Sequence, residues 1–205
     1  MKLQLGLLLV VAPALVFAGP TEDLVKRLAV VQTLSGSFQQ VVLDQGGTRL
    51  QEASGDMQMA RGNRFRWHTL QPFEQLAVSD GHTVWIYDVD LEQVVEKPLT
   101  PDTASTPALL FGGDPGQVSE AFMVEEGARD GKMVTYRLAP RNDDTMFVEL
   151  EVTFVGKMPH SMRLEDALGQ QTSLDFQDAR INEPLDNSVF DFTPPDGVDV
   201  IRQSE

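Results

Sequence analysis

The sequence predicts a mainly β protein with a few helices, built on an antiparallel sheet. The strongest indication is a strict alternation over residues 146–154, in which every second side chain (Met146, Val148, Leu150, Val152, Phe154) is apolar. A second is that turn dipeptides such as Asp80-Gly81 and Gly156-Lys157 separate successive apolar runs, as they do in hairpins. Because the alternation leaves a polar face, we expect one side of the sheet to face water.

Residues 1–18 have the character of a signal peptide. Lys2 precedes an apolar run from Leu3 to Val11, and the small residues near Ala18 suit cleavage after that position. The run is shorter than the ~20 apolar residues that a membrane-spanning helix needs, although an uncleaved anchor is the alternative. We therefore expect export, with residues 19–205 forming a single domain.

The first element after the signal peptide is expected to be a helix. Thr21 is its predicted cap, and an apolar stripe that includes Leu28 runs along the segment from Leu24 to Thr33. Gly36 is expected just past its end.

Strands joined by short turns follow along most of the remaining chain. The predicted strands cover residues 38–43, 53–60, 64–68, 76–79, 83–88, 93–97, 133–139, 146–154, 161–164 and 172–177. In the third of these, Phe65 and Trp67 share one face, because side chains alternate along a strand.

The segment from Pro101 to Gly113 interrupts this β pattern. Thr106-Pro107 predicts the start of a short helix, and Gly112-Gly113 predicts its end. Between them, Leu109, Leu110 and Phe111 are consecutive apolar residues that need cover from water. Residues 115–123 are predicted to form another short helix.

Composition and motifs exclude several classes of function. The chain has 31 acidic and 16 basic residues, a net charge of -15 and a pI near 4.5, which disfavours nucleic acid and anionic membrane surfaces. It has no cysteine, so thiol catalysis and thiolate metal sites are excluded. His68, His82 and His160 lack the spacing of metal ligands, and we expect no catalytic residues, metal or cofactor. An enzyme assembled from dispersed residues is the open alternative.

Several ordered motifs resemble one known family. They comprise Arg61, Asn63, Phe65, Trp67, His68, Gln71-Pro72, Val78-Ser79-Asp80-Gly81, Val84-Trp85-Ile86-Tyr87, Thr106-Pro107-Ala108-Leu109-Leu110 and Phe190–Val198. In this order they resemble the LolA family of periplasmic carriers that move lipoproteins to the outer membrane, and the likeness runs from about Leu24 to Val198. Gly62 departs from the family pattern, in which proline is expected.

The resemblance implies an incomplete antiparallel β-barrel of about eleven strands around an apolar concavity, closed by a lid of short α-helices. It also implies a location in the periplasm, acylated lipoproteins as cargo, the inner-membrane LolCDE ABC transporter as donor and a LolB-type outer-membrane receptor as acceptor. A monomer without nucleic acid is expected. Because LolB-type receptors carry a lipid-modified cysteine that this chain lacks, the resemblance favours the carrier. A periplasmic lipid-binding sensor or regulator on the same half-barrel is the alternative.

The resemblance further implies roles for individual residues. Arg61 is expected to latch the lid through main-chain oxygens near Leu28 and near Phe111 and Gly112. The residues expected to contact acyl chains or partners are Phe65, Trp67, Leu109 and Leu110. For Phe65, a buried aromatic beside Trp67 is the competing interpretation.

Overall fold

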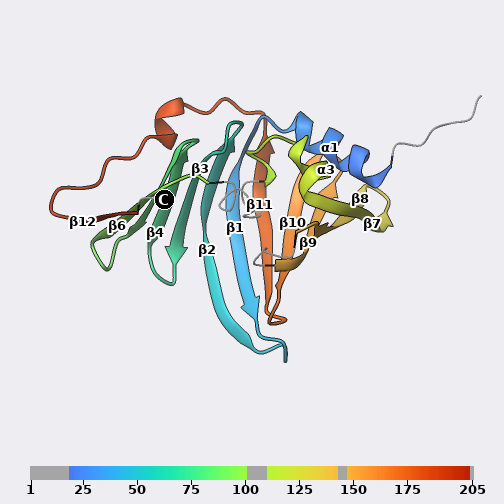
Figure 1. Cartoon of the computed structure of the whole chain (residues 1–205), viewed down its shortest axis with the longest axis horizontal. Coiled ribbons are helices and arrows are strands. Elements are labelled where there is room, and N and C mark those ends of the chain that lie inside the picture. The colour runs from blue at the N-terminus through green and yellow to red at the C-terminus, as the bar shows by residue number, and fades with distance from the viewer. Residues whose placement is uncertain (1–18, 101–109, 143–146, 204–205) are drawn as a thin grey trace, which may run out of the picture.

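The computed structural model describes residues 19–100, 110–142 and 147–203. Within them, one curved sheet of twelve strands has the order β12-β6-β5-β4-β3-β2-β1-β11-β10-β9-β8-β7 (Figure 1). The strands of its first half are β1 Thr33–Leu43, β2 Arg49–Ala60, β3 Arg64–Gln71, β4 Gln75–Asp80, β5 Thr83–Asp88 and β6 Gln93–Pro98. Those of the second half are β7 Phe122–Asp130, β8 Met133–Pro140, β9 Phe147–Val155, β10 Met158–Asp166, β11 Gln171–Ile181 and β12 Asp199–Arg202. The helices are α1 Pro20–Val30, α3 Gln117–Ala121 and the short 3-10 helix η2 Asn187–Phe190.

The sheet is open, because β12 and β7 form its two edges and do not pair with each other. Eleven neighbouring pairs connect the twelve strands, and all are antiparallel except β12 with β6. The predicted mainly β fold with an unclosed antiparallel sheet is therefore confirmed. Two strands were missed: β7, whose pattern is broken by a register shift between Glu126 and Arg129, and the parallel edge strand β12.

Helix α1 begins and ends earlier than predicted. Its cap is the backbone of Gly19 with Pro20 in the first turn, and Thr21 lies inside the helix, so the predicted Thr21 cap is wrong. The helix ends at Val30 because Thr33 already pairs with Ala60 at the start of β1. Gly36 is inside β1, where a Cβ atom would come within 2.7 Å of the Gln177 carbonyl oxygen.

The alternation in β9 is displaced at its start. Leu150, Val152 and Phe154 are buried as predicted, but Val148 is 49% exposed and Phe147 is 3% exposed. The cause is a register shift opposite β10, between Glu165 and Asp166, which turns Phe147 inward. Met146, which was expected on the apolar side, lies outside the described residues.

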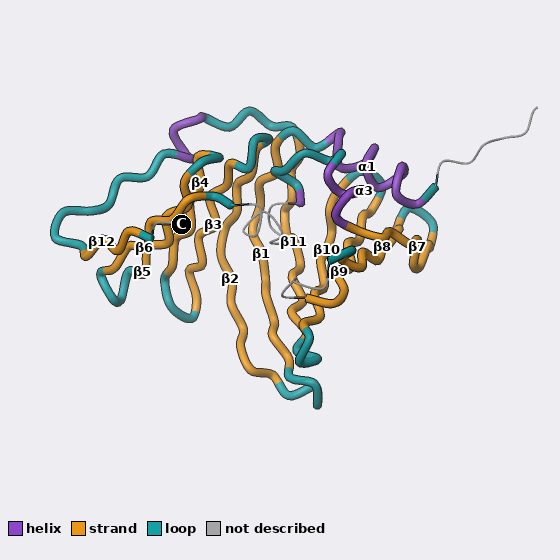
Figure 2. The backbone as a smooth tube through the Cα atoms, viewed as in Figure 1, coloured by secondary structure: helices purple, strands orange, loops and turns teal. Residues whose placement is uncertain are grey.

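Apolar residues are buried on both faces of the sheet. The main core includes Phe38, Met57, Phe65 and Phe154 together with Leu24 and Leu28 of α1, and we call this side the inner face. The opposite, outer face of β4 to β6 buries Val78 and Val94. On the same face the half-buried Phe192 packs against Trp85 and Tyr87, with ring centroids 6.2 Å apart in each pair. Figure 2 shows the helices at one end of the strands, α1 and α3 beside β7 and η2 beside β3 and β4.

Candidate functional site

Arg61 lies in the turn between β2 and β3 and reaches the two segments that cover the inner face. Its Nη2 donates to the carbonyl oxygen of Leu28 in α1, and its Nη1 donates to the carbonyl oxygen of Gly113. Its own backbone N–H donates to Gln32 O at 3.1 Å. One guanidinium thus joins α1 and residues 110–113 to the same turn of the sheet.

The turn that carries Arg61 also contacts the second segment through its backbone. Asn63 N donates to Gly112 O at 3.0 Å, and a Cβ atom on Gly112 would lie 3.2 Å from Ala60 O. Gly62 and Asn63 have φ values of 85° and 57°. Proline is fixed near φ −65°, so the residue that the family pattern leads one to expect at Gly62 could not adopt this turn.

Burial lowers the pKa of Arg61, while the nearby charge of Asp114 raises it. Starting from the high pKa of a guanidinium, this shift leaves Arg61 charged at neutral pH. Both hydrogen bonds of its guanidinium are therefore charge-assisted, and such bonds are stronger than those between neutral groups.

Residues 110–113 place the aromatic side chain of Phe111 in the core. Phe111 is 1% exposed and makes edge contacts with Phe154 and Phe176, at centroid distances of 6.2 and 5.8 Å. Leu110 is half-buried and packs against the same core. The predicted helix starting at Thr106, including Leu109, lies outside the described residues.

The aromatic pair singled out in the sequence lies on the inner face. Phe65 is 9% exposed and belongs to the core, so in this structure it is not on an exposed rim. Trp67 stacks on Phe38 with ring centroids 4.1 Å apart and an angle of 29° between the planes.

A polar cluster that the sequence did not reveal fixes α1 to the other half of the sheet. Arg27 donates to the Tyr136 hydroxyl at 2.7 Å and to Gly156 O at 2.7 Å, and the Tyr136 hydroxyl donates to Asp23. Burial and the bond to Asp23 raise the pKa of Tyr136 to about 12. Burial raises the pKa of Asp23, but the Tyr136 bond and the charges of Arg27 and Arg129 outweigh it, so this pKa is lowered. Tyr136 and Arg27 are too far apart in sequence for a local pattern to predict the pair.

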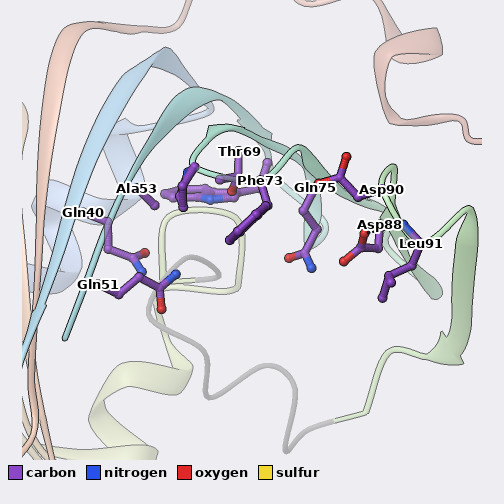
Figure 3. Close-up of a pocket in the computed structure, with 11 residues that line it drawn as sticks. Gln40, Gln51, Ala53, Thr69, Phe73, Gln75, Asp88, Asp90 and Leu91 are labelled. Atoms are coloured by element: carbon purple, nitrogen blue, oxygen red, sulfur yellow. Dashed lines mark hydrogen bonds between the residues drawn. The ribbon is translucent and has the colours of Figure 1, made fainter.

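A groove of about 550 Å³ opens on the inner face near the loops that follow β3 and β5 (Figure 3). The described residues lining it are Gln40, Gln51, Ala53, Trp67, Thr69, Pro72, Phe73, Gln75, Asp88, Asp90 and Leu91. Figure 3 shows Gln40 and Gln51 on one side of the groove and Asp88, Asp90 and Leu91 on the other. Phe73 and Leu91 are 69% and 70% exposed.

The described ranges contain no group of three His, Asp or Glu side chains placed to hold a metal ion. Among the helices of the same ranges, none combines the length and apolar character needed to cross a membrane.

Comparison with known proteins places this arrangement in a family. The model described as outer membrane lipoprotein carrier protein LolA matches residues 29–193. An outer-membrane lipoprotein carrier protein of Alcanivorax borkumensis is 52% identical over 207 residues, covering 98% of this chain and 99% of the relative. One from Azotobacter vinelandii is 42% identical over 201 residues, covering 96% and 97%.

Solved structures share the fold at low identity. A LolA superfamily protein from Nitrosomonas europaea has a TM-score of 0.50 at 10% identity, covering 85% of this chain and 99% of its own. An uncharacterized conserved protein from Thermus thermophilus has a TM-score of 0.55 at 16% identity, covering 89% and 97%. These two matches support the open-sheet fold alone. The family model and the full-length relatives establish more, and the chain belongs to the LolA family of outer membrane lipoprotein carrier proteins.

Proposed function

We propose that this chain carries lipoproteins through the periplasm by covering their acyl chains with the inner face of the sheet. The observation that carries the proposal is the cover of that face. It consists of α1 and residues 110–113, and Arg61 joins the two by one hydrogen bond to each. Residues 110–113 are joined to the sheet by hydrogen bonds from Arg61 and from Asn63 N, so in this proposal they are the part of the cover that a competing apolar ligand displaces.

The energetics require such a displaceable cover. Each exposed methylene costs about 0.8 kcal/mol in water, so the acyl chains of a lipoprotein cost tens of kcal/mol unless they are covered. A permanently open apolar face would bind them too tightly to release them. Because the buried Phe111 must leave the core for lipid to enter, the ligand gains only the difference between the two states.

In this proposal Arg61 is the latch, and Leu28 O and Gly113 O are its acceptors. The second hydrogen bond of Arg61, expected near Phe111 and Gly112, goes to Gly113 O. Gly112 O accepts a hydrogen bond from Asn63 N in the β2–β3 turn instead. The position of Phe65, Trp67 and Leu110 favours contact with acyl chains over contact with a partner's surface. Leu109 keeps the same proposed role.

The partners belong to the proposal as well. The LolCDE transporter of the inner membrane is the proposed donor, and a LolB-type outer-membrane receptor is the proposed acceptor. The carrier is expected to act as a monomer, after cleavage following Ala18, without a cofactor and without catalysis.

Purification of the chain from periplasm, followed by mass spectrometry of what it holds, tests the proposal directly. Recovery of acylated proteins, and their transfer to a receptor in a reconstituted assay, is the expected result. Recovery of phospholipid alone, with no acylated protein and no transfer, would contradict it and favour a lipid-binding sensor.

A further inference from the structure

The inner face changes from apolar to polar along a sharp line that the strand register defines. One row across β3 to β6 consists of Trp67, Ala77, Ile86 and Val95, which are cross-strand neighbours. The next row toward the hairpin loops consists of Thr69, Gln75, Asp88 and Gln93. The groove lies on this boundary, with Trp67 on one side of it and Thr69 and Gln75 on the other.

The polar part of the groove is rich in uncharged groups that can both donate and accept hydrogen bonds. Gln51 and Gln75 are exposed, while Gln40 and Thr69 are half-buried. Carboxamides offer two donors and an acceptor, and hydroxyls offer one donor. This set suits ester carbonyls and amide groups, which are polar but carry no charge.

The charged groups in the groove have a single sign. Its described lining residues include Asp88 and Asp90 and no lysine, arginine or histidine. Asp88 also accepts a hydrogen bond from Leu91 N at 3.0 Å, which holds its carboxylate in the β5–β6 turn. A phosphate brought to this groove would meet two like charges and no cation.

We infer that the groove binds the uncharged ester and amide junction between the acyl chains and the polypeptide of an acylated protein, and that Asp88 and Asp90 select against anionic phospholipids. The inference rests on the proposed carrier function. Acyl chains on the inner face would place their attachment point at the polar row. A carrier working between two membranes meets phospholipids with similar chains, so discrimination at this groove depends on the polar groups next to the chains.

Two double variants separate the parts of this inference. Gln51→Leu with Gln75→Leu removes carboxamides at nearly constant volume. We expect about tenfold weaker binding of a synthetic triacylated lipopeptide, since two neutral hydrogen bonds contribute of this order. Binding of a long-chain fatty alcohol, which lacks the junction, should change less than about twofold. The single variant Gln39→Leu, on the outer side of the same sheet, is the matched control.

Asp88→Asn with Asp90→Asn removes the charges and retains the acceptor for Leu91 N. We expect binding of a short-chain phosphatidylglycerol to strengthen by roughly three- to tenfold at low salt, the range expected for two partly solvated charges. Added salt should also strengthen the binding of phosphatidylglycerol to the unmodified chain, because salt screens the repulsion between the phosphate and the two carboxylates. Lipopeptide binding by this variant should stay within about twofold.

The results separate failure of the inference from failure of the proposed function. If the unmodified chain does not bind the lipopeptide, the carrier function itself is contradicted. If it binds but the glutamine variant binds equally well, or the aspartate variant leaves phosphatidylglycerol binding unchanged, the inference about the groove is overturned and the carrier function stands.

Discussion

Replacement of Arg61 by leucine tests the latch, because it removes both side-chain bonds that join the cover to the β2–β3 turn. In the present structure one guanidinium serves Leu28 O and Gly113 O. Leucine packs in similar space and donates nothing. The backbone bond from Asn63 N to Gly112 O stays, so residues 110–113 lose one of their attachments and keep another.

The structure sets the size of the expected effect. A hydrogen bond from a charged group contributes about 1.5–3 kcal/mol. The cost of burying the guanidinium offsets part of the stabilisation from the two bonds. We therefore expect Arg61→Leu to destabilise the closed state, relative to the open state, by about 3 kcal/mol. Since 1.4 kcal/mol is a factor of ten, the opening equilibrium should shift about 100-fold. An acyl ligand that binds only the open form should gain affinity by the same factor, up to the point where the open form predominates.

Loading and delivery should therefore respond in opposite directions. Titration with a fluorescent acyl probe should show tighter binding by the Arg61→Leu variant. Transfer of a loaded lipoprotein to the receptor should slow in proportion, because release requires the weakened closed state. Arg66→Leu removes the same charge from the outer side of β3 and should behave like the unmodified chain. Transfer by Arg61→Leu at the normal rate, with unchanged probe affinity, would refute the latch.

Three further changes probe the packing around the site. Phe65→Ala should lower the free energy of unfolding by about 3 kcal/mol in urea denaturation, and a loss below about 1 kcal/mol would contradict its core position. Phe190, 2% exposed on the outer face, should show a similar loss on truncation to alanine but unchanged acyl binding, since it lies on the other side of the sheet. The pKa of Tyr136 is raised from 10.0 to about 12 in the folded chain, so its contribution to stability is complete below pH 10 and is lost as the pH rises toward 12. Tyr136→Phe should flatten that alkaline decline, and an equal decline in both proteins would show that another group is responsible.

The strands were largely predictable because each depends on local pattern. Residues 83–88 form β5 with the predicted bounds, and the turn at Asp80-Gly81 forms where a positive φ is needed. In β9 the alternation predicted the wrong burial for Phe147 and Val148, because the pairing with β10 shifts register there. The register shift that turns Phe147 inward is set by β10, and no property of β9 alone indicates it.

Of the polar contacts around the site, those of Arg61 could be anticipated from the sequence, and those of the Asp23, Arg27 and Tyr136 cluster could not. Arg61 stood out because it belongs to a motif that resembles a family, and not because an arginine in a turn is unusual. Asp23, Arg27 and Tyr136 belong to no recognisable motif. Tyr136 is 109 residues from Arg27 and 113 from Asp23, so no local pattern could predict that the three side chains meet. Gly113, and not Gly112, accepts the second Arg61 bond, which depends on how residues 110–113 rest on the β2–β3 turn.

The sequence by itself predicted the fold class and the family and singled out Arg61 as the candidate latch, because alternation, turn dipeptides and ordered motifs can be recognised in short stretches of consecutive residues. Only the tertiary structure decided which carbonyl oxygens Arg61 binds, which face Phe65 occupies and where the apolar rows give way to glutamines. Those outcomes depend on strand register and sheet curvature, and both are set by residues far apart in the chain.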